Sequence, residues 1–397
     1  MISHMRNLYL FAFFLVIYEF TAYSANDMIM PGMIEVVKQF NAPISYVALS
    51  LSLYMLGECA IQLWLGPLAE KYGKRKAILY GNFSFLIFTL IIATSTSIEQ
   101  FMLGRWLQGS GMAFIAMGYA LIHEKFNDKN AVRIIAIMGN VSILAPLIGP
   151  LIGGVIVSVS NWHYVFVLSL ILGSISLIGL YRYAPESNTN NDQMNFRKIL
   201  IHYREIAYSA NFMQGVCSIL FAAMPLLIWI GIAPNLILYN LKLSYSKFII
   251  YQMIAIGGLS VSSLVIQFLA GKWELHQLIR RGCYISLGGI ILSLIGSQSI
   301  NIIAIGIFIY SFGLGLSNGS IIRIIMSNKN LSQSMTASLM TFIQTLAFAL
   351  GIELSDFFCN KFNYSGFSFT FACTIFAIIA TLVTRKFAKA NESRNWQ

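Results

Sequence analysis

Two acidic residues, Glu19 and Asp27, lie within the first apolar stretch of the chain, residues 8–33. This stretch is long enough to cross a bilayer, because about 20 apolar residues span the hydrocarbon core. Inserting an ionised carboxylate near the centre of such a helix costs roughly 2.5–3.5 kcal/mol, and carboxylates placed there usually mark the path of an ion or a substrate. We therefore expect Glu19 and Asp27 to bind protons and substrate.

The spacing of the two carboxylates suits this chemistry. They are eight residues apart, or about 12 Å along a helix at its usual rise, so both can face one cavity at different depths. Competition between a proton and a cationic substrate for the same carboxylates would make their exchange obligatory.

The composition places these residues in an all-α integral membrane protein. Of the 397 residues, 57% are hydrophobic and only 10% are charged, whereas soluble domains carry about 25% charged residues. A polar, Asn-rich segment, 184–210, is expected to be a cytoplasmic linker between two six-helix bundles, 1–183 and 211–397. The apolar runs predict twelve spans, at about 8–32, 44–66, 77–95, 99–121, 132–157, 162–183, 211–238, 247–270, 279–298, 300–322, 334–355 and 365–384.

The formal charge of +11 reports orientation rather than a nucleic-acid partner. With the N-terminus inside, the 26 Lys and Arg fall in cytoplasmic loops and tails, apart from Arg105 within a span and four in outer loops: Lys38, Lys242, Lys247 and Lys361. This is the positive-inside bias of a bundle with both termini in the cytoplasm. The first apolar run could imitate a secretory signal, but eleven more spans follow, so we expect it to stay uncleaved.

Other chemistry has weaker support in the sequence. The five Cys and five His residues have no metal-ligand spacing, so we expect no metal, no cofactor and no disulfide framework. His123 and Asp128 form an H-x-x-x-x-D spacing that resembles that of glycerolipid acyltransferases, and a His with a carboxylate partner can activate a hydroxyl. The spacing stands alone in a short loop, so we expect no catalytic residues and no enzyme.

The loop between spans 2 and 3, GPLAEKYGKRK, is basic and contains two glycines. Its plain interpretation is a positive-inside anchor, with Gly66 allowing close approach of a helix end and Gly73 supplying a positive φ. The loop also resembles the G-x-L-a-D-r-x-G-r-k signature of the major facilitator superfamily, with Glu70 in place of the usual Asp. The resemblance implies that Gly66, Glu70, Gly73, Lys74 and Arg75 form a cytoplasmic charge latch that holds the outward-facing state.

Arg105 lies in span 4, in the segment LGRWLQGSGMA. An arginine in a membrane must find an anion or carbonyl groups, unless it sits near the outer end of the span and its head group reaches the interface. The segment resembles the R-x-x-q-G signature of the same superfamily through Arg105, Gln108 and Gly109. The resemblance implies that Arg105 faces the central cavity and tunes the span-1 carboxylates.

Span 5 contains GNVSILAPLIGPLIGG, in which Ala145, Gly149 and Gly153 repeat every four residues. Small residues at this spacing allow another helix to approach closely. The segment also resembles the antiporter motif of exporters in the superfamily, which implies export rather than import. The residues that match or flank it are Pro146, Gly149, Pro150, Gly153 and Gly154.

Nearly the whole chain resembles the MdfA-type multidrug:proton antiporters of this superfamily, above all through YEFTAYSANDMIMPGM, residues 18–33. The resemblance implies two pseudo-symmetric halves and export of lipophilic, often cationic drugs by alternating access, driven by the proton gradient. It assigns Glu19 and Asp27 as the protonation and recognition pair and adds four pocket-lining positions: Tyr23, Asn26, Met138 and Asn140. It also implies a monomer in the bacterial inner membrane, surrounded by lipid. The alternative is a proton-coupled facilitator for one solute, such as a siderophore, sugar or amino acid.

Two further acidic residues have alternative interpretations, and two prolines predict a distortion of one span. Glu58, in span 2, stands where the family has a small apolar residue; it could be an extra protonation site, a partner of Arg105, or a residue near the membrane surface. Glu353, in span 11, could serve function, packing or topology. Pro225 and Pro234, in span 7, predict a kinked helix.

Overall fold

The computed structural model describes residues 2–187, 196–269, 272–327 and 333–392, except for some side chains within these ranges. The chain divides into two compact units, Met1–Asn195 and Phe196–Gln397. The boundary falls inside the polar segment 184–210. Part of that segment, which we expected to be a plain linker, forms the amphipathic helix α9, Phe196–Tyr208, which packs against helices of unit 2.

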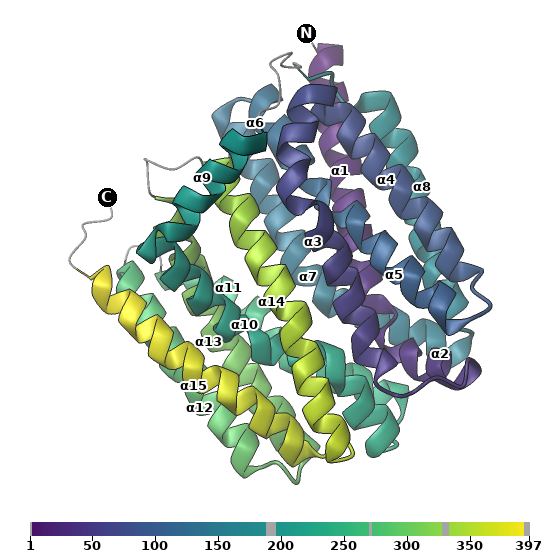
Figure 1. Cartoon of the computed structure of the whole chain (residues 1–397), viewed down its shortest axis with the longest axis vertical. Helices are drawn as coiled ribbons and strands as arrows, with labels where there is room; N and C mark the ends of the chain where they lie inside the picture. The colour runs from purple at the N-terminus through teal and green to yellow at the C-terminus, as the bar shows by residue number, and fades with distance from the viewer. Residues whose placement is uncertain (1, 188–195, 270–271, 328–332, 393–397) are drawn as a thin grey trace. The chain divides into compact units, whose positions relative to one another are not determined.

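Unit 1 is built from long apolar helices and short connections (Figure 1). Its elements are α1 (Ile2–Met28), η1 (Met30–Gly32), α2 (Met33–Gln39), α3 (Tyr46–Tyr72), α4 (Lys74–Ala93), α5 (Ile98–Ala113), α6 (Ile115–Lys125), α7 (Asp128–Val159) and α8 (His163–Tyr183). Unit 2 continues after α9 with α10 (Ala210–Pro234), η2 (Asn235–Asn240), α11 (Tyr245–Leu269), α12 (Leu275–Ile295), α13 (Ile300–Met326), α14 (Gln333–Lys361) and α15 (Gly366–Ala390).

The two units share one order of helix packing. In unit 1, α3 and α4 both pack on α5, α1 packs on α7 and α8, and α4 packs on α8. In unit 2, α11 and α12 both pack on α13, α10 packs on α14 and α15, and α12 packs on α15. The long helices of the two units therefore pack in the same order, with α4 and α8 of unit 1 corresponding to α12 and α15 of unit 2.

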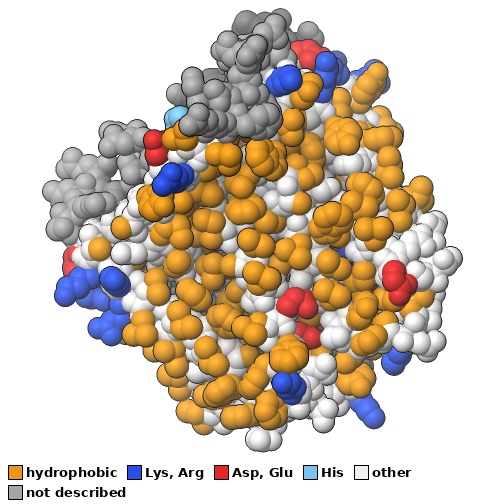
Figure 2. Space-filling model, viewed as in Figure 1, with side chains coloured by type: hydrophobic (Ala, Val, Ile, Leu, Met, Phe, Trp, Pro, Cys, Tyr) orange, Lys and Arg blue, Asp and Glu red, His pale blue; other side chains and the backbone are white. Residues whose placement is uncertain are grey.

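The helix surfaces are those of membrane spans. Large apolar side chains such as Ile178, Phe268 and Ile295 are exposed on the long helices, and in Figure 2 hydrophobic side chains cover most of the visible helix surface while Lys and Arg gather toward its margins. Ten helices of the described part are long and apolar enough to cross a membrane, or eleven if the bent halves of α7 count as one span. The predicted span at 99–121 is divided at Phe114 into α5 and α6, each too short to qualify alone, so a count of twelve stays a prediction.

Glycine and proline shape several helix ends. Gly73, between α3 and α4, has φ 96°, which confirms the positive φ expected there. Gly66 differs from expectation, because a Cβ added to it would meet no atom within 4 Å and no close approach of a neighbour requires it. α7 bends by 41° between Val141 and Leu144, just ahead of Pro146, whose missing N–H removes a hydrogen bond to the preceding turn.

In unit 2, α10 contains Pro225 and ends at Pro234. The chain then continues directly as the π-helical turn η2, and the kink predicted from Pro225 and Pro234 stays a prediction. π-Helical turns are rare in proteins, and those that occur are often found at functional sites.

Candidate functional site

Glu19 is completely buried in the middle of α1. The Tyr119 hydroxyl, on α6, donates a hydrogen bond to Oε1 of Glu19 at 2.7 Å. The other oxygen, Oε2, is buried and has no hydrogen-bond partner in the described part of the chain. One half of the carboxyl group is therefore held in place by Tyr119, and the other half is available to a proton or a ligand.

Asp27 lies in the last turn of α1 and is also buried. The side-chain amide of the neighbouring Asn26 donates to Oδ1 of Asp27 at 3.3 Å, and Oδ1 of the same amide accepts from Nη2 of Arg105 at 3.0 Å. Asn26 therefore links the guanidinium to the carboxylate. Asn26, which was predicted to line the pocket, is buried in this structure, and its pocket-lining role stays a prediction.

Arg105 is held by neutral acceptors. A guanidinium has five N–H donors, and Arg105 makes five hydrogen bonds, of 2.8–3.3 Å, to two backbone carbonyls and three side-chain oxygens. The acceptors are Ser50 Oγ, Ala25 O, Gln108 Oε1, Asn26 O and Asn26 Oδ1. The guanidinium also lies 4.6 Å from the centre of the Tyr54 ring, within the range of a cation–π contact.

The surroundings of Arg105 differ from both sequence-based interpretations. Its side chain is fully buried, so it does not reach the membrane interface. It is also enclosed by α1, α3 and its own helix rather than open to a cavity. The reason is the close contact of α3 and α5: a Cβ added to Gly109 would lie 1.9 Å from the Tyr54 carbonyl oxygen, so the two backbones nearly touch beside the guanidinium.

Small residues also bring neighbouring helices against α1 at both carboxylates. A Cβ on Gly153 of α7 would lie 1.7 Å from the carbonyl oxygen of Met28, and one on Gly149 would lie 3.4 Å from Cβ of Asp27. This confirms the close approach predicted from the spacing in span 5. On α6, a Cβ on Gly118 would meet the Leu15 side chain at 2.4 Å, and this contact brings the adjacent Tyr119 within reach of Glu19.

The predicted antiporter-motif and pocket residues have different surroundings. Gly154 and Pro150 are buried and Pro146 is partly exposed. Tyr23 is partly exposed and packs against the core of unit 1, and Asn140 is exposed. Met138, which was predicted to line the pocket, is fully buried in that core.

An apolar pocket of about 350 Å³ lies between the N-terminal halves of α1 and α7. Its lining residues are Tyr9, Ala12, Phe13, Val16, Asn130, Arg133, Ile134 and Ile137. Ala12 and Val16 belong to a helix face that continues to Glu19 and Tyr23 at spacings of three and four residues. The pocket therefore lies on the same face of α1 as Glu19, and its volume is in the range of small-molecule sites.

Glu58 lies on α3, one turn after Tyr54, and is partly exposed. Tyr23 interacts electrostatically with both Glu58 and Glu19, so the third carboxylate is close to the first. No ion pair joins Glu58 to Arg105 in the described residues, and all five guanidinium donors are used elsewhere. Of the predicted alternatives, pairing with Arg105 is therefore wrong.

The basic loop between α3 and α4 is held by ion pairs within unit 1. Lys74 Nζ lies 2.9 Å from Oε2 of Glu124, which also pairs with Lys125 at 2.8 Å. Arg75 pairs with Glu186 and donates to the carbonyl of Tyr181 at 2.8 Å. Partial burial raises the pKa of the Glu124 carboxyl, but the hydrogen bonds and charges of Lys125 and Lys74 outweigh this effect and leave it below its ordinary value of 4.5. The side chain of Glu70 lies outside the described residues, as does that of Asp128.

Several residues of these sites were missed by the sequence analysis. Tyr119, Glu124 and Glu186 each pair with a residue at least 50 positions away. A shortage of anions to match Lys74 and Arg75 was the signal that could have pointed to Glu124 and Glu186. Unit 2 also contains a buried carboxylate, Asp356 on α14, whose Oδ1 is 3.5 Å from Nδ2 of Asn235 in η2.

Comparison with known proteins places this arrangement in a family. The sequence model of the Major Facilitator Superfamily matches residues 15–352. The chain is 36% identical over 356 residues to the multidrug transporter MdfA of Yersinia pestis bv. Antiqua (strain Angola), covering 88% of this chain and 87% of that protein. It is 35% identical, with the same coverage, to the multidrug transporter MdfA of Escherichia coli O6:H1.

Solved structures show the same fold at low sequence identity. A bacterial homologue of the human lysosomal transporter Spinster, inward-facing and unoccupied, matches with a TM-score of 0.74 and 12% identity over 99% of this chain and 98% of that one. The human organic anion transporter MFSD10 matches with a TM-score of 0.71 and 14% identity over 96% and 99%. The repeated order of helix packing, the family match and the curated relatives agree: this chain belongs to the Major Facilitator Superfamily.

Proposed function

We propose that this protein exports lipophilic, often cationic small molecules across the bacterial cytoplasmic membrane in exchange for protons. Glu19 and Asp27 would be protonated or substrate-bound in turn as the protein alternates its access to the two sides. Glu19 carries this proposal: a fully buried carboxyl group with one oxygen held by Tyr119 and the other unpaired. The relatives named multidrug transporter, which match 88% of the chain, support it.

The energetics of the site favour exchange. A carboxylate buried without a countercharge is costly, and either a proton or a cationic ligand relieves that cost. At Asp27 the positive charge of Arg105 lies behind Asn26 rather than in direct contact. Asp27 therefore has partial compensation but keeps the capacity to bind a proton or a cation. The apolar pocket between α1 and α7 would receive the hydrophobic part of a substrate, because it continues the helix face that carries Glu19.

The remaining assignments follow from the same proposal. Both termini would lie in the cytoplasm, the protein would act as a monomer, and the proton gradient would be its energy source without a cofactor. The ion pairs of Lys74 and Arg75 would form the charge latch of the cytoplasmic side. Pro146, Gly149, Pro150, Gly153 and Gly154 would hold α7 against α1 around Asp27.

Glu58 would supply an additional protonation site in the same region. Its support is its place one turn from Tyr54 and its interaction with Tyr23, which also interacts with Glu19. The number of protons exchanged for each monovalent cation should then fall in Glu58→Gln while exchange continues. An unchanged proton count in this variant would assign no coupling role to Glu58.

The test of the main proposal uses proteoliposomes with an imposed pH gradient and a lipophilic cation such as tetraphenylphosphonium. We expect counterflow of the cation in the wild type and its loss in Glu19→Gln, Asp27→Asn and the double variant. The matched control is Glu99→Gln, which neutralises an exposed carboxylate at the start of α5 and should leave exchange unchanged.

Two results would contradict this proposal. Retained counterflow in the double variant would show that the two carboxylates are not the exchange site. Absence of counterflow for lipophilic cations in the wild type, with gradient-driven uptake of one defined solute, would instead identify a proton-coupled facilitator.

A further inference from the structure

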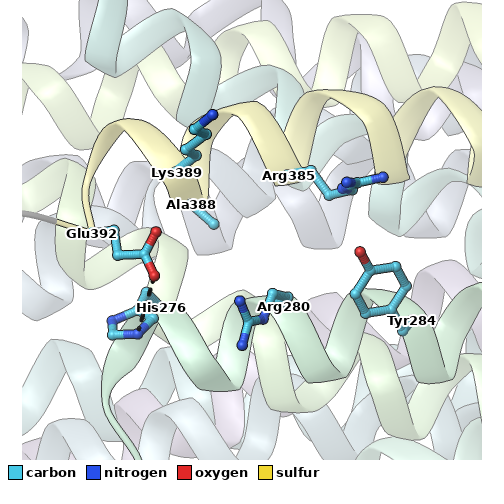
Figure 3. A pocket seen from close by; sticks show the side chains of 7 residues that line it. All are labelled: His276, Arg280, Tyr284, Arg385, Ala388, Lys389 and Glu392. Atoms are coloured by element: carbon cyan, nitrogen blue, oxygen red, sulfur yellow. Dashed lines mark ion pairs between the residues drawn. The ribbon is translucent and has the colours of Figure 1, made fainter.

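A cavity of about 220 Å³ lies between the first turns of α12 and the last turns of α15, within unit 2. Figure 3 shows α12 and α15 side by side, with the Tyr284 hydroxyl directed from α12 toward Arg385 on α15 and the Arg280 guanidinium lying alongside α12. The full lining is His276, Arg280, Tyr284, Arg385, Ala388, Lys389 and Glu392. A water molecule occupies about 30 Å³ in the liquid, so the cavity has room for a phosphate group.

The cavity has an excess of positive charge. Arg280, Arg385 and Lys389 form no ion pair within 4 Å among the described residues. The one carboxylate in the lining, Glu392, faces His276 instead, with Oε1 at 3.9 Å from Nε2. Arg280, Arg385 and Lys389 all contribute to the lining, and an anion bound there would reduce the repulsion between like charges.

Unit 1 provides an internal comparison. At the corresponding junction, where α4 begins and α8 ends, Arg75 of α4 pairs with Glu186, just beyond the end of α8. The arrangement of helices is the same in unit 2, where the carboxylate just beyond the end of α15, Glu392, faces His276 of α12 instead of an arginine. Among the described residues no carboxylate lies within 4 Å of Arg280 or Arg385. Arg75 at the unit 1 junction is therefore neutralised by Glu186, whereas the arginines of the unit 2 junction have no carboxylate partner among the described residues.

The donors of the cavity suit a phosphate. Guanidinium groups present paired N–H donors that match the oxygens of a phosphate, while an ammonium such as Lys389 binds it as a point charge. Arg385 on α15 lies 5.9 Å from the centre of the Tyr284 ring on α12. The tyrosine therefore supports the guanidinium and adds a hydroxyl donor to the cavity lining.

An exposed apolar surface continues from the cavity along both helices. On α12, Tyr284, Ile291 and Ile295 follow Arg280 at spacings of four, seven and four residues, and are 46%, 43% and 79% exposed. On α15, Leu382 and Ile378 precede Arg385 at spacings of three and four residues. Each series stays near one helix face, so acyl chains attached to a phosphate in the cavity would lie along exposed apolar side chains.

The height of the cavity in the membrane agrees with this occupant. Trp273, just ahead of α12, lies under the guanidinium of Arg281 at 4.0 Å, and tryptophans are enriched at the level of the lipid headgroups. Basic pockets between membrane helices are suited to the headgroups of anionic lipids. A soluble anion would use the cations but none of the apolar surface.

We propose that the α12–α15 cavity binds the phosphate of an anionic phospholipid, with Arg280, Arg385 and Lys389 holding the headgroup and the exposed faces of α12 and α15 holding its acyl chains. In the orientation proposed above, this lipid belongs to the cytoplasmic leaflet. The site is separate from the buried carboxylates of unit 1, and its occupancy does not depend on which solute the protein carries.

The test is a lipid titration of the full-length protein in detergent, read by native mass spectrometry. The probes are phosphatidylglycerol, phosphatidylcholine with the same acyl chains, and inorganic phosphate. The wild type should retain phosphatidylglycerol in preference to phosphatidylcholine, and millimolar phosphate should not displace it. Because one basic residue near a membrane surface contributes about fivefold in affinity for anionic lipid, Arg280→Gln/Arg385→Gln/Lys389→Gln should weaken that binding by on the order of 100-fold.

The matched control is Lys272→Gln/Arg281→Gln/Lys386→Gln, which removes the same charge from the same end of unit 2 without touching the cavity lining. It should bind phosphatidylglycerol like the wild type, and both triple variants should elute as folded protein in size-exclusion chromatography. Equal losses in the two triple variants, or none in the first, would overturn the proposal. Displacement of phosphatidylglycerol by phosphate would also overturn it and identify a soluble-anion site.

If the cavity triple variant does not fold, the single variant Arg385→Gln should still lose about fivefold in affinity, and wild-type affinity there would count against the site.

Discussion

The Tyr119 hydroxyl is the hydrogen-bond donor that unit 1 provides to the carboxyl group of Glu19, at 2.7 Å from Oε1. The contact joins α6 to α1 across a separation of 100 residues and leaves Oε2 of Glu19 buried and unpaired. A single donor can steady a carboxylate without satisfying it. This is the property that an exchange site requires, since a fully satisfied carboxylate would have little affinity for either ligand.

Removing this donor should weaken substrate binding. In Tyr119→Phe the charged form of Glu19 loses its hydrogen bond, and bonds to charged groups contribute about 1.5–3 kcal/mol. The protonated form of Glu19 is then favoured over the charged form, so a proton competes better with a cation. We expect the apparent affinity for a lipophilic cation to fall about tenfold near neutral pH and to approach the wild-type value at alkaline pH, measured by equilibrium binding to purified protein. Tyr181→Phe, which changes an exposed ring, is the control. Wild-type affinity in Tyr119→Phe would rule out this role for the hydroxyl.

Arg105 should tolerate no replacement, including lysine. Its five hydrogen bonds depend on a planar group with five donors, and an ammonium offers three. Arg105→Lys should therefore leave at least two buried acceptors unpaired, at about 1–3 kcal/mol each. We expect a lower melting temperature and a loss of exchange at equal protein levels. Full activity in Arg105→Lys would mean that charge alone suffices and that the hydrogen-bond geometry is dispensable.

Gly153 and Gly139, both on α7, should respond in opposite directions to alanine. A Cβ on Gly153 would lie 1.7 Å from the Met28 carbonyl oxygen, whereas one on Gly139 would meet nothing within 4 Å. Gly153→Ala should push α7 away from α1 beside Asp27, at a cost of about 1–3 kcal/mol. Gly139→Ala should be neutral or stabilising by about 0.5–1 kcal/mol. Thermal unfolding and cation counterflow of the two variants test this, and similar melting temperatures would contradict the close contact.

The ion pairs of Glu124 should contribute to stability at neutral pH and not in acid. The pKa of Glu124 lies below 4.5, so its contribution is fully present above the unfolded-state value and is lost as the pH falls through the folded-state value. Glu124→Gln should lower stability by about 1 kcal/mol or less near pH 7. The difference from the wild type should persist down to the unfolded-state value, shrink as the pH falls through the lower folded-state value, and be absent below it.

Melting temperatures measured across this pH range provide the check, with Glu205→Gln on α9 as an exposed control. A difference between Glu124→Gln and the wild type that persists at the acid end would show that the latch does not act through charge. Since Glu124 stays ionised at neutral pH, any pH dependence of exchange near neutrality should survive in this variant.

The sequence by itself determined that this protein folds in a lipid bilayer and which acidic residues lie within its membrane spans. Long apolar runs with few charges cannot fold in water and require a bilayer, and the cost of a charge in that bilayer singles out Glu19 and Asp27. The positive φ at Gly73 and the close helix contact at Gly149 and Gly153 could also be predicted from the sequence, because each requires a residue without a side chain.

Only the tertiary structure decided what surrounds those carboxylates. Apolar residues facing lipid and apolar residues facing the core look alike in sequence, so the burial of Met138 could not be separated from a place in a pocket. Nor could the enclosure of Arg105, whose acceptors on α1 lie about 80 residues away along the chain, or the pairing of Glu19 with Tyr119. These contacts depend on which helix faces meet, and helix packing is fixed by the summed shape of many side chains rather than by any local pattern.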